Sequence, residues 1–191
     1  PSRDRATITA VAAAASGSAD NQFIMTSYYR EQLAALPEMG LVGDQLWQQS
    51  GLAPSDMDAA ILYDHFTPYT LLQLEELGFC GRGEAKDFVR QPGAPEVGGT
   101  LPLHTHGGQL GEAYIHGMNG IAEAVRQVRG TSVNQVANVE NVLATAGTGV
   151  GLANIRERLQ LLYGATASVT VAENQPSGTV VSIAVPYRTV T

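Results

Sequence analysis

The chain has 191 residues with 11 basic and 18 acidic side chains, giving a formal net charge of −7, and 44% of its residues are apolar. This length fits one domain or slightly more, and the apolar fraction is sufficient for a buried core. The acidic balance argues against nucleic acid as a partner, because phosphate binding requires clustered Lys and Arg. The single cysteine, Cys80, excludes an intrachain disulfide framework and a thiolate zinc site. Since no apolar run could span a bilayer and no signal-peptide pattern is present, we expect a cytoplasmic protein without membrane association.

The first third of the chain predicts a parallel α/β unit. Residues 6–15 are small or β-branched and predict a strand that ends at a Ser-Gly-Ser turn. Residues 39–50 predict a helix, and after a short turn residues 59–63 predict a buried strand. The helix has three large apolar residues on one side, namely Leu41, Leu46 and Trp47.

The middle of the chain predicts helices separated by an irregular stretch. A helix is expected from Pro68 to about Leu77, followed by a short one over 84–90. Residues 91–108 are rich in Gly and Pro and predict irregular structure. Residues 109–129 then predict one long helix that ends before Gly130 and carries an apolar stripe of Leu110, Tyr114, Met118, Ile121, Val125 and Val128.

The last part of the chain changes in character after a predicted strand at 142–146. A Gly-rich turn at 147–151 precedes a predicted helix over 152–163. Residues 168–171 and 180–185 alternate with a period of two, and the loop 174–178 joins them as a hairpin.

Two segments carry most of the residues capable of chemistry. The first is Tyr63-Asp64-His65-Phe66-Thr67, at the end of a predicted strand, and the second is the Gly-rich run 104–119, which leads into a helix. Loops at the carboxyl ends of strands form sites in α/β folds, and tyrosines and histidines can supply acid and base groups. Three histidines, His104, His106 and His116, also raise the question of a metal. Their spacing lacks an accompanying acidic residue, so we expect no metal.

The sequence over about 5–150 resembles the C-terminal half of thiolase-like proteins related to the sterol carrier protein x thiolase, in their actinobacterial steroid-degradation branch. The strings that carry this resemblance are MTSYYRE, LYDHFTPYTLLQLEELGFCGRGEAKDFV, LPLHTHGGQLGEAYIHGMNGIAEAVRQVRGTSVNQV and NVLATAGTG. The resemblance implies an α/β fold, with a layered sheet that forms the C-terminal half of a thiolase. We therefore expect residues 1–146 to form this domain, with the N-terminal half of the fold outside this chain.

Departures from the Claisen-type thiolases indicate a different reaction. Where those enzymes have the histidine of a G-H-P motif, this chain has Tyr114, and where they have a polar residue upstream it has Tyr63. Ala146-Gly147 stands near the place of their late C-x-G cysteine, and Cys80 is expected to be a structural thiol. This pattern is similar to retro-aldolases that remove a side-chain fragment from a steroid β-hydroxyacyl-CoA.

The resemblance implies roles for individual residues and partners. Tyr63, Tyr114, His65 and His106 are expected to be catalytic, with a histidine lowering the tyrosine pKa from its usual value near 10. Gly107, Gly108 and His116 are expected to bind the substrate, the glycine amides as donors to the thioester oxyanion. No cofactor is expected beyond the acyl-CoA substrate. A separate OB-fold, zinc-ribbon protein and a second copy of the chain are the expected partners.

The segment 147–191 resembles a second family, the ATP-binding domain of sensor histidine kinases. Its second glycine box is represented here by Gly147, Gly149 and Gly151, followed by the domain's last helix and strands. The magnesium-binding and adenine-binding motifs of that family are not found upstream, so we expect a structural tail without a nucleotide site. The alternatives to the aldolase reading are an inactive thiolase-fold fragment or fusion, and an ATP-binding kinase remnant.

Overall fold

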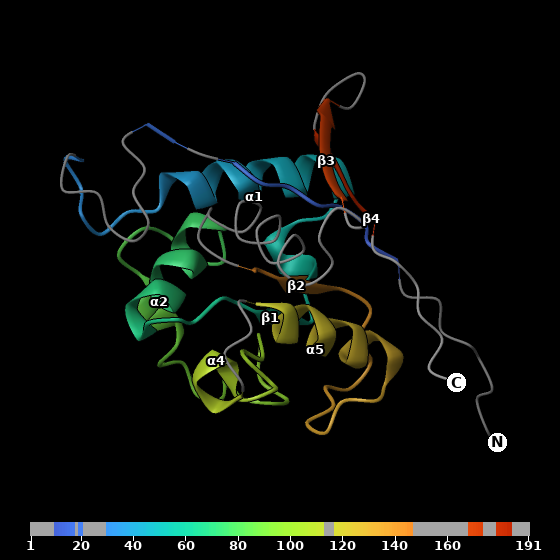
Figure 1. Ribbon diagram of the computed structural model, residues 1–191. Helices are drawn as coiled ribbons and strands as arrows, with labels where there is room; N and C mark the ends of the chain where they lie inside the picture. Colours follow the sequence, from blue (N-terminus) through green and yellow to red (C-terminus); the bar gives the residue numbers. More distant parts are fainter. Residues whose placement is uncertain are drawn as a thin grey trace, which may run out of the picture.

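The computed structural model describes residues 10–17, 19–20, 30–112, 117–146, 168–173 and 179–184 (Figure 1). These residues form an α/β fold, as the sequence predicts. Its elements are α1 (Pro37–Ser50), a 3₁₀ turn (Pro54–Asp56), β1 (Ala59–Ile61), α2 (Thr67–Glu76), α3 (Ala85–Phe88), α4 (Gly108–Gly111), α5 (Met118–Arg129), β2 (Val142–Ala144), β3 (Ser168–Glu173) and β4 (Thr179–Ala184).

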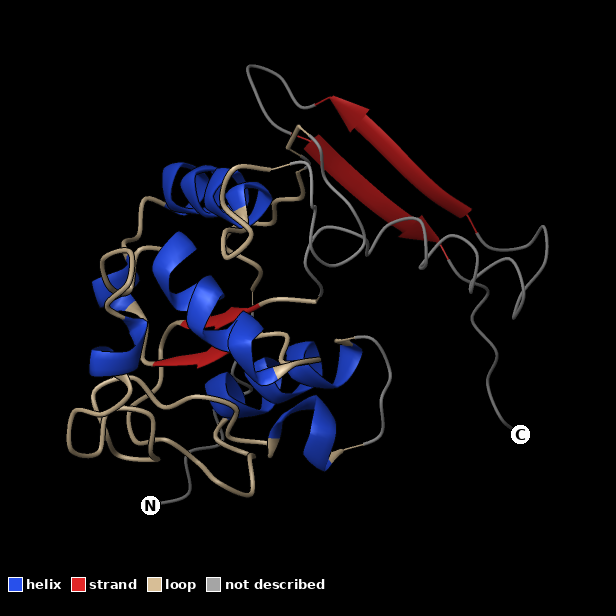
Figure 2. Ribbon diagram, turned by 90° about the vertical axis from the view of Figure 1, so that its left-hand side faces the viewer, coloured by secondary structure: helices blue, strands red, loops and turns tan. Residues whose placement is uncertain are grey.

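The main sheet is small and parallel. β1 pairs with β2 in a register that runs from Ala59 opposite Val142 to Ile61 opposite Ala144, and Leu103 adds a parallel bridge to Ala60 on the other side of β1. In Figures 1 and 2 this sheet lies between α1 and α2 on one face and α5 on the other. The arrangement confirms the predicted layered unit of sheet and helices.

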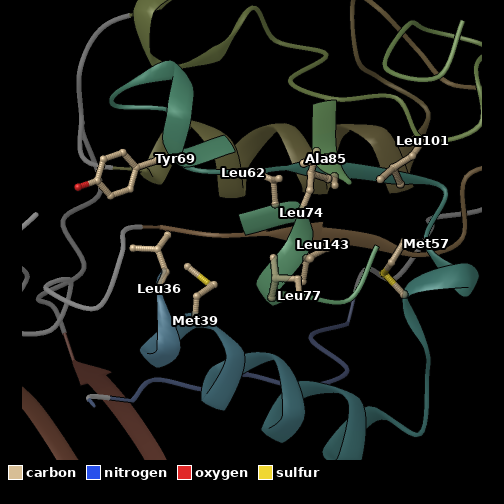
Figure 3. Packing of buried hydrophobic residues seen from close by; sticks show 11 residues of the cluster. Leu36, Met39, Met57, Leu62, Tyr69, Leu74, Leu77, Ala85, Leu101 and Leu143 are labelled. Atoms are coloured by element: carbon tan, nitrogen blue, oxygen red, sulfur yellow. The ribbon is translucent and has the colours of Figure 1, made fainter. Parts of the chain in front are cut away.

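The core follows the alternation of side chains along the strands. Ala60, Leu62 and Leu143 belong to the cluster that packs against α1 and α2 (Figure 3). Ile61 points to the opposite face, where a side chain added at Gly120 of α5 would lie 3.1 Å from its Cγ2 atom. Both faces of β1 are therefore covered, which is why the strand is continuously apolar. The α1–α2 face is filled chiefly by Leu36, Met39, Met57, Tyr69, Leu74, Leu77, Ala85 and Leu101.

The helices on this face agree with the predicted positions. α1 begins with Pro37 in its first turn and ends at Gly51, whose φ of +70° only glycine adopts readily. The indole Nε1 of Trp47 donates a hydrogen bond of 3.1 Å to the Leu77 carbonyl, which joins α1 to the end of α2. Leu41 does not share the buried side, since it is 47% exposed.

The prediction of one continuous helix over 109–129 is wrong, because the structure has two separate helices there. α4 ends at Gly111, and α5 begins only after Gly117, which has a φ of +86°. A Cβ atom on Gly117 would lie 2.5 Å from the Cα atom of Ala146, so a residue with a side chain could not sit this close to the end of β2. Tyr114 and His116 lie outside the described residues.

The orientation of α5 also differs from the prediction. Met118 and Ile121, from the predicted apolar stripe, are 52% and 39% exposed. The buried residues of α5 are polar or lack a side chain, and they are Asn119, Gly120, Glu123 and Gln127. Thus α5 faces the sheet with its polar side.

The strand predicted over 6–15 is not found in its described part. Residues 10–15 have no regular secondary structure and are mostly exposed; Val11, for example, is 83% exposed. This segment runs beside α1 (Figure 1), and the Cβ position of Gly17 lies 3.4 Å from Val42 Cγ2. Among the described strands none pairs with it, and an unpaired extended segment is not a strand.

The predicted hairpin near the end of the chain is confirmed. β3 and β4 pair antiparallel, from Ser168 opposite Ala184 to Glu173 opposite Thr179. The helix predicted over 152–163 lies outside the described residues. In the part of the chain that the structure describes, no helix has both the length and the apolar character needed to cross a membrane.

Candidate functional site

The chemistry-bearing segments meet at one edge of the parallel sheet. Tyr63, Asp64 and His65 follow the carboxyl end of β1, and Thr145 follows the carboxyl end of β2. Residues 104–108 follow Leu103, which is bridged in parallel to the same strand. Because carboxyl ends of parallel strands lie at the same edge, both segments singled out from the sequence arrive at one place.

The main chain of Tyr63 is held by two buried side chains. Its N–H donates to Thr145 Oγ1 at 2.7 Å, and its carbonyl accepts from Gln73 Nε2 at 2.9 Å. The Thr145 hydroxyl in turn donates to Gln73 Oε1 at 2.7 Å. Tyr63 itself is only 6% exposed. Sequence patterns gave no sign of Gln73 or Thr145 as residues of this site.

An aromatic cluster surrounds His65. Its ring centroid lies 4.9 Å from that of Tyr63 and 4.4 Å from that of Tyr69. Phe66 completes the cluster at 5.2 Å and is 49% exposed. Burial lowers the pKa of His65, although the Tyr63 main chain and the Asp64 charge act in the opposite direction. The neutral imidazole is therefore the favoured form at neutral pH, and its buried Nδ1 has no hydrogen-bond partner among the described residues.

His104, which the sequence suggested only as a possible metal ligand, supports the loop. Its Nε2 lies 2.8 Å from the Leu62 carbonyl, which can only accept, so this nitrogen carries the proton. Its φ of +50° is unusual for a residue other than glycine. Burial lowers the pKa of His104. The Asp64 charge and the hydrogen bond to the Leu62 carbonyl act in the opposite direction, but their effects are smaller.

His106 lies beside the polar network of α5. Both of its ring nitrogens are buried, and neither has a hydrogen-bond partner in the part of the chain that the structure describes. Burial would raise the pKa of Glu123, but hydrogen bonds from Ser132, Thr105 and Gln127, together with the His106 charge, bring it below its usual value. His106 therefore contributes to the electrostatic surroundings of a buried carboxylate.

The Gly107-Gly108 turn is shaped by Asp64, a residue that the sequence reasoning did not select. The Asp64 carboxylate accepts a hydrogen bond of 2.7 Å from the Gln109 N–H, at the start of α4. A Cβ atom on Gly108 would collide with this carboxylate. The Gly107 N–H already donates to the His104 carbonyl at 2.7 Å, so in this conformation it is not available to a substrate oxyanion.

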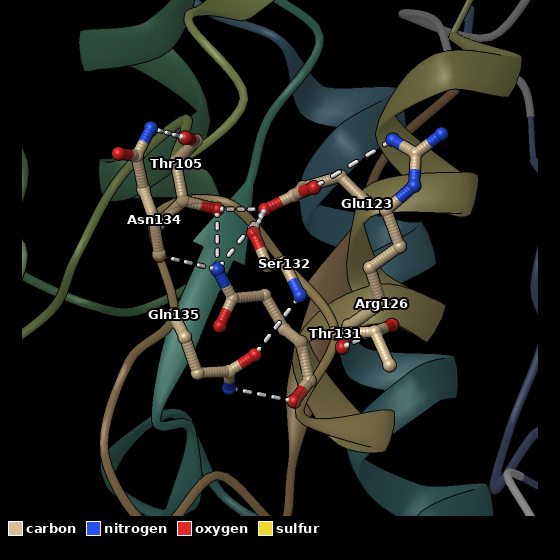
Figure 4. A network of polar contacts seen from close by, with 8 residues as sticks. Thr105, Glu123, Arg126, Thr131, Ser132, Asn134 and Gln135 are labelled. Atoms are coloured by element: carbon tan, nitrogen blue, oxygen red, sulfur yellow. Dashed lines mark hydrogen bonds and ion pairs between the residues drawn. The ribbon is translucent and has the colours of Figure 1, made fainter.

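The polar face of α5 forms a closed hydrogen-bond network (Figure 4). Glu123 Oε1 accepts from Thr105 Oγ1 and from Ser132 Oγ, both at 2.6 Å. Gln127 Nε2 donates to the same Glu123 oxygen at 3.0 Å and to the Asn134 carbonyl at 2.9 Å. These bonds explain how a helix can bury a carboxylate and an amide. They also fix the loop that carries His106.

Tyr114 and His116 lie outside the described residues, as do Gly147, Gly149 and Gly151. Within the described ranges, no group of three His, Cys, Asp or Glu residues is arranged to hold a metal ion. Cys80 lies at the edge of the core, and burial, with the charges of Glu75 and Glu84, raises the pKa of its thiol. A raised pKa is the opposite of what a thiolate nucleophile needs.

Comparison with known proteins relates the chain to enzymes of steroid degradation. A 17-hydroxy-3-oxo-4-pregnene-20-carboxyl-CoA lyase from Mycobacterium tuberculosis is 72% identical over 140 residues, which make up 73% of this chain and 36% of that protein. A steroid side-chain-cleaving aldolase from Thermomonospora curvata is 72% identical over 137 residues, 72% of this chain and 35% of that protein. The chain thus spans about a third of the length of these relatives.

A solved structure and a family model agree with this relationship. The structure named Ltp2-ChsH2(DUF35) aldolase matches with a TM-score of 0.68 and 72% identity, over 71% of this chain and 35% of that one. The family model described as thiolase C-terminal domain-like matches residues 25–156. The chain belongs to the thiolase C-terminal domain-like family.

Proposed function

We propose that this chain is the C-terminal part of a retro-aldolase that cleaves a steroid side-chain β-hydroxyacyl-CoA. The observation that carries the proposal is the 72% identity over 140 residues with a steroid carboxyl-CoA lyase. The site geometry supports it, because Tyr63, His65 and the His106-Gly107-Gly108 segment all lie at the carboxyl edge of the parallel sheet.

In the proposed reaction, a base removes the proton of the β-hydroxyl group. The bond between the α and β carbons breaks, the β carbon becomes a ketone, and the electron pair passes to the thioester as an enolate, which is then protonated. Tyr63 and Tyr114 are proposed as the base and the acid, with His65 and His106 adjusting their proton affinity. Neither a metal nor a cofactor is required, and no covalent bond to Cys80 forms.

The proposed oxyanion contacts follow from the state of the glycine turn. Because the Gly107 N–H donates to His104, the Gly108 N–H is the donor that we assign to the thioester oxygen. Gly107, with a φ of +95°, is then needed for the shape of the turn. His116 is proposed as a further substrate contact.

We also propose two partners, a second copy of the chain and a separate OB-fold, zinc-ribbon protein. The name of the solved relative, which joins Ltp2 and ChsH2(DUF35), supports a second protein. Sedimentation of the chain with and without such a protein tests both proposals.

A chimaera tests the proposed function. The matched residues of the M. tuberculosis lyase are replaced by those of this chain, and 17-hydroxy-3-oxo-4-pregnene-20-carboxyl-CoA is supplied. Tyr63→Phe and Tyr114→Phe should each lower the cleavage rate by about 10²-fold or more, the usual contribution of an acid or base group. Unchanged rates in both site variants would leave the tyrosines with a packing role only.

The segment 147–191 is proposed to be a tail that resembles a histidine kinase fragment but binds no nucleotide. The antiparallel pairing of β3 and β4 supports a structural role. An inactive thiolase-fold fragment remains the second candidate for the whole chain, and the exposure of Met118 and Ile121 on α5 is the observation that favours it.

A further inference from the structure

The end of β1 departs from the regular ladder at Tyr63. The last main-chain bond between the strands runs from the Thr145 N–H to the Ile61 carbonyl at 3.0 Å. Continuing the register of Ile61 opposite Ala144 would direct the Tyr63 N–H to the main-chain carbonyl of Thr145. The Thr145 hydroxyl accepts this N–H instead, at 2.7 Å.

Gln73 closes this arrangement from the other side. Its amide nitrogen donates to the carbonyls of Tyr63 at 2.9 Å and Tyr69 at 3.1 Å, and its amide oxygen accepts from the Thr145 hydroxyl at 2.7 Å. Gln73 is 0% exposed and Thr145 is 7% exposed. Every side-chain polar atom of the pair therefore has a partner, away from competing water.

The consequence is that one pair of side chains holds both main-chain polar groups of Tyr63. We propose that Gln73 and Thr145 are positioning residues, which set the place of the Tyr63 ring for the cleavage reaction. This inference rests on the proposed function of Tyr63. It extends the site to two residues that do not need to touch the substrate.

The pair also links the site to α2 and to the aromatic cluster. Gln73 bonds the carbonyl of Tyr69, whose ring lies 4.4 Å from that of His65, and His65 lies 4.9 Å from Tyr63. A change in Gln73 should therefore shift Tyr63 and its neighbouring histidine together. A displacement of about 1 Å in a reacting group can cost about 10²-fold in rate.

Asp58 provides a matched control at the opposite end of the same two strands. Its Oδ2 accepts from the main-chain N–H groups of Glu140 at 2.8 Å and Asn141 at 2.9 Å. Like Thr145, it joins β1 to β2 through a side chain and the main chain. Asp58→Ala should loosen the sheet without reaching Tyr63.

The first measurement is amide hydrogen exchange at Tyr63 in the 191-residue chain, which needs no activity. Thr145→Val should accelerate exchange at Tyr63 by about tenfold, the scale of one lost hydrogen bond, and Thr145→Ser should restore protection. Asp58→Ala should leave it slow once global stability is matched. Gln73→Glu keeps the acceptor for the Thr145 hydroxyl but loses the donor to the Tyr63 carbonyl, and it should also accelerate exchange at Tyr63. Equal exchange in Thr145→Val and Asp58→Ala would overturn the inference.

The second measurement is steady-state cleavage in the chimaera of the proposed function. Thr145→Val and Gln73→Glu should lower kcat by about 10²-fold with little change in KM, and Thr145→Ser should recover most of the rate. A rate in Thr145→Val equal to that of Asp58→Ala would overturn the positioning role. If the unsubstituted chimaera cleaves nothing, the proposed function fails, whereas the exchange result still decides whether the pair holds Tyr63.

Discussion

His65 and His104, at the carboxyl end of β1, both have pKa values lowered chiefly by burial. In the unfolded chain they would take up protons near pH 6.5, but in the folded chain only at lower pH. Below about pH 6.5 the unfolded state therefore binds more protons than the folded state, and the free energy of unfolding must decrease as the pH is lowered. Well above that value both histidines are neutral in either state and add no slope.

His104→Asn should reduce this pH dependence. Asparagine tolerates the positive φ of this position but does not titrate. Urea unfolding at about pH 7.5 and about pH 5.5 should show a smaller loss of free energy in the variant than in the unsubstituted chain. His65 contributes to the slope that remains, whereas the lowered pKa of Glu123 acts at lower pH. An unchanged loss would mean that His104 is protonated in the folded state as easily as in the unfolded one.

Cys80→Ala should leave the proposed cleavage unchanged. The reaction forms no bond to sulfur, and the raised pKa of the thiol disfavours a thiolate. The measurement is kcat in the chimaera, after matching protein stability. A loss of activity as large as that of Tyr114→Phe would indicate covalent chemistry and contradict the aldol mechanism.

At the residue scale, the sequence located Tyr63 and His65 correctly, because a buried apolar run before a polar string indicates the end of a strand. It could not identify Gln73 or Thr145 as their neighbours, nor the contact of Asp64 with the start of α4. Thr145 is 82 positions from Tyr63, and no local pattern encodes a bond across that separation. Gln73 has the spacing of an ordinary helix residue and differs only in what lies opposite it.

Among the elements, α5 shows the limit of periodicity most clearly. Its repeat of apolar residues is real, and the structure places Met118 and Ile121 on the exposed side. The polar side is buried because Glu123 and Gln127 find partners in Thr105, Ser132 and Asn134. Periodicity indicates that a helix has two different sides, but not which side the rest of the chain covers.

In an ordinary amphipathic helix, substitutions on the apolar side destabilise the protein most. In α5 we expect the larger loss of stability from substitutions on the polar side. Ile121→Gln should change the free energy of unfolding by no more than about 0.5 kcal/mol, as an exposed substitution does. Gln127→Met, of similar volume, should cost about 1–3 kcal/mol because it strands buried partners such as the Val136 N–H. Urea unfolding of this chain measures both. A larger loss for Ile121→Gln would show that the apolar side is the buried one.

Element boundaries were predictable where local chemistry sets them. Gly51 and Gly78, both with positive φ, follow α1 and α2 near the expected residues. The break before α5 was not predictable, because Gly117 is required by its contact with Ala146, a residue distant in sequence. The hairpin of β3 and β4 was predictable from strict alternation and a turn-forming loop.

The segment 147–191 is predicted to bind no nucleotide. We expect Mg-ATP to bind with a dissociation constant no lower than the millimolar range, because no adenine-binding or magnesium-binding motif precedes Gly147. A millimolar constant corresponds to a binding free energy of only about 4 kcal/mol. Isothermal titration of the full chain tests this. A micromolar dissociation constant that Gly149→Val abolishes would instead favour the kinase remnant.

At the scale of the whole molecule, the chain spans about a third of relatives that carry lyase and aldolase names. The most direct measurement is therefore the products formed by the chimaera from 17-hydroxy-3-oxo-4-pregnene-20-carboxyl-CoA. Retro-aldol cleavage predicts a steroid ketone and a shortened acyl-CoA in equal amounts, with no release of free CoA. Release of free CoA without a ketone, or an intact substrate under conditions where the parent lyase is active, would contradict the account.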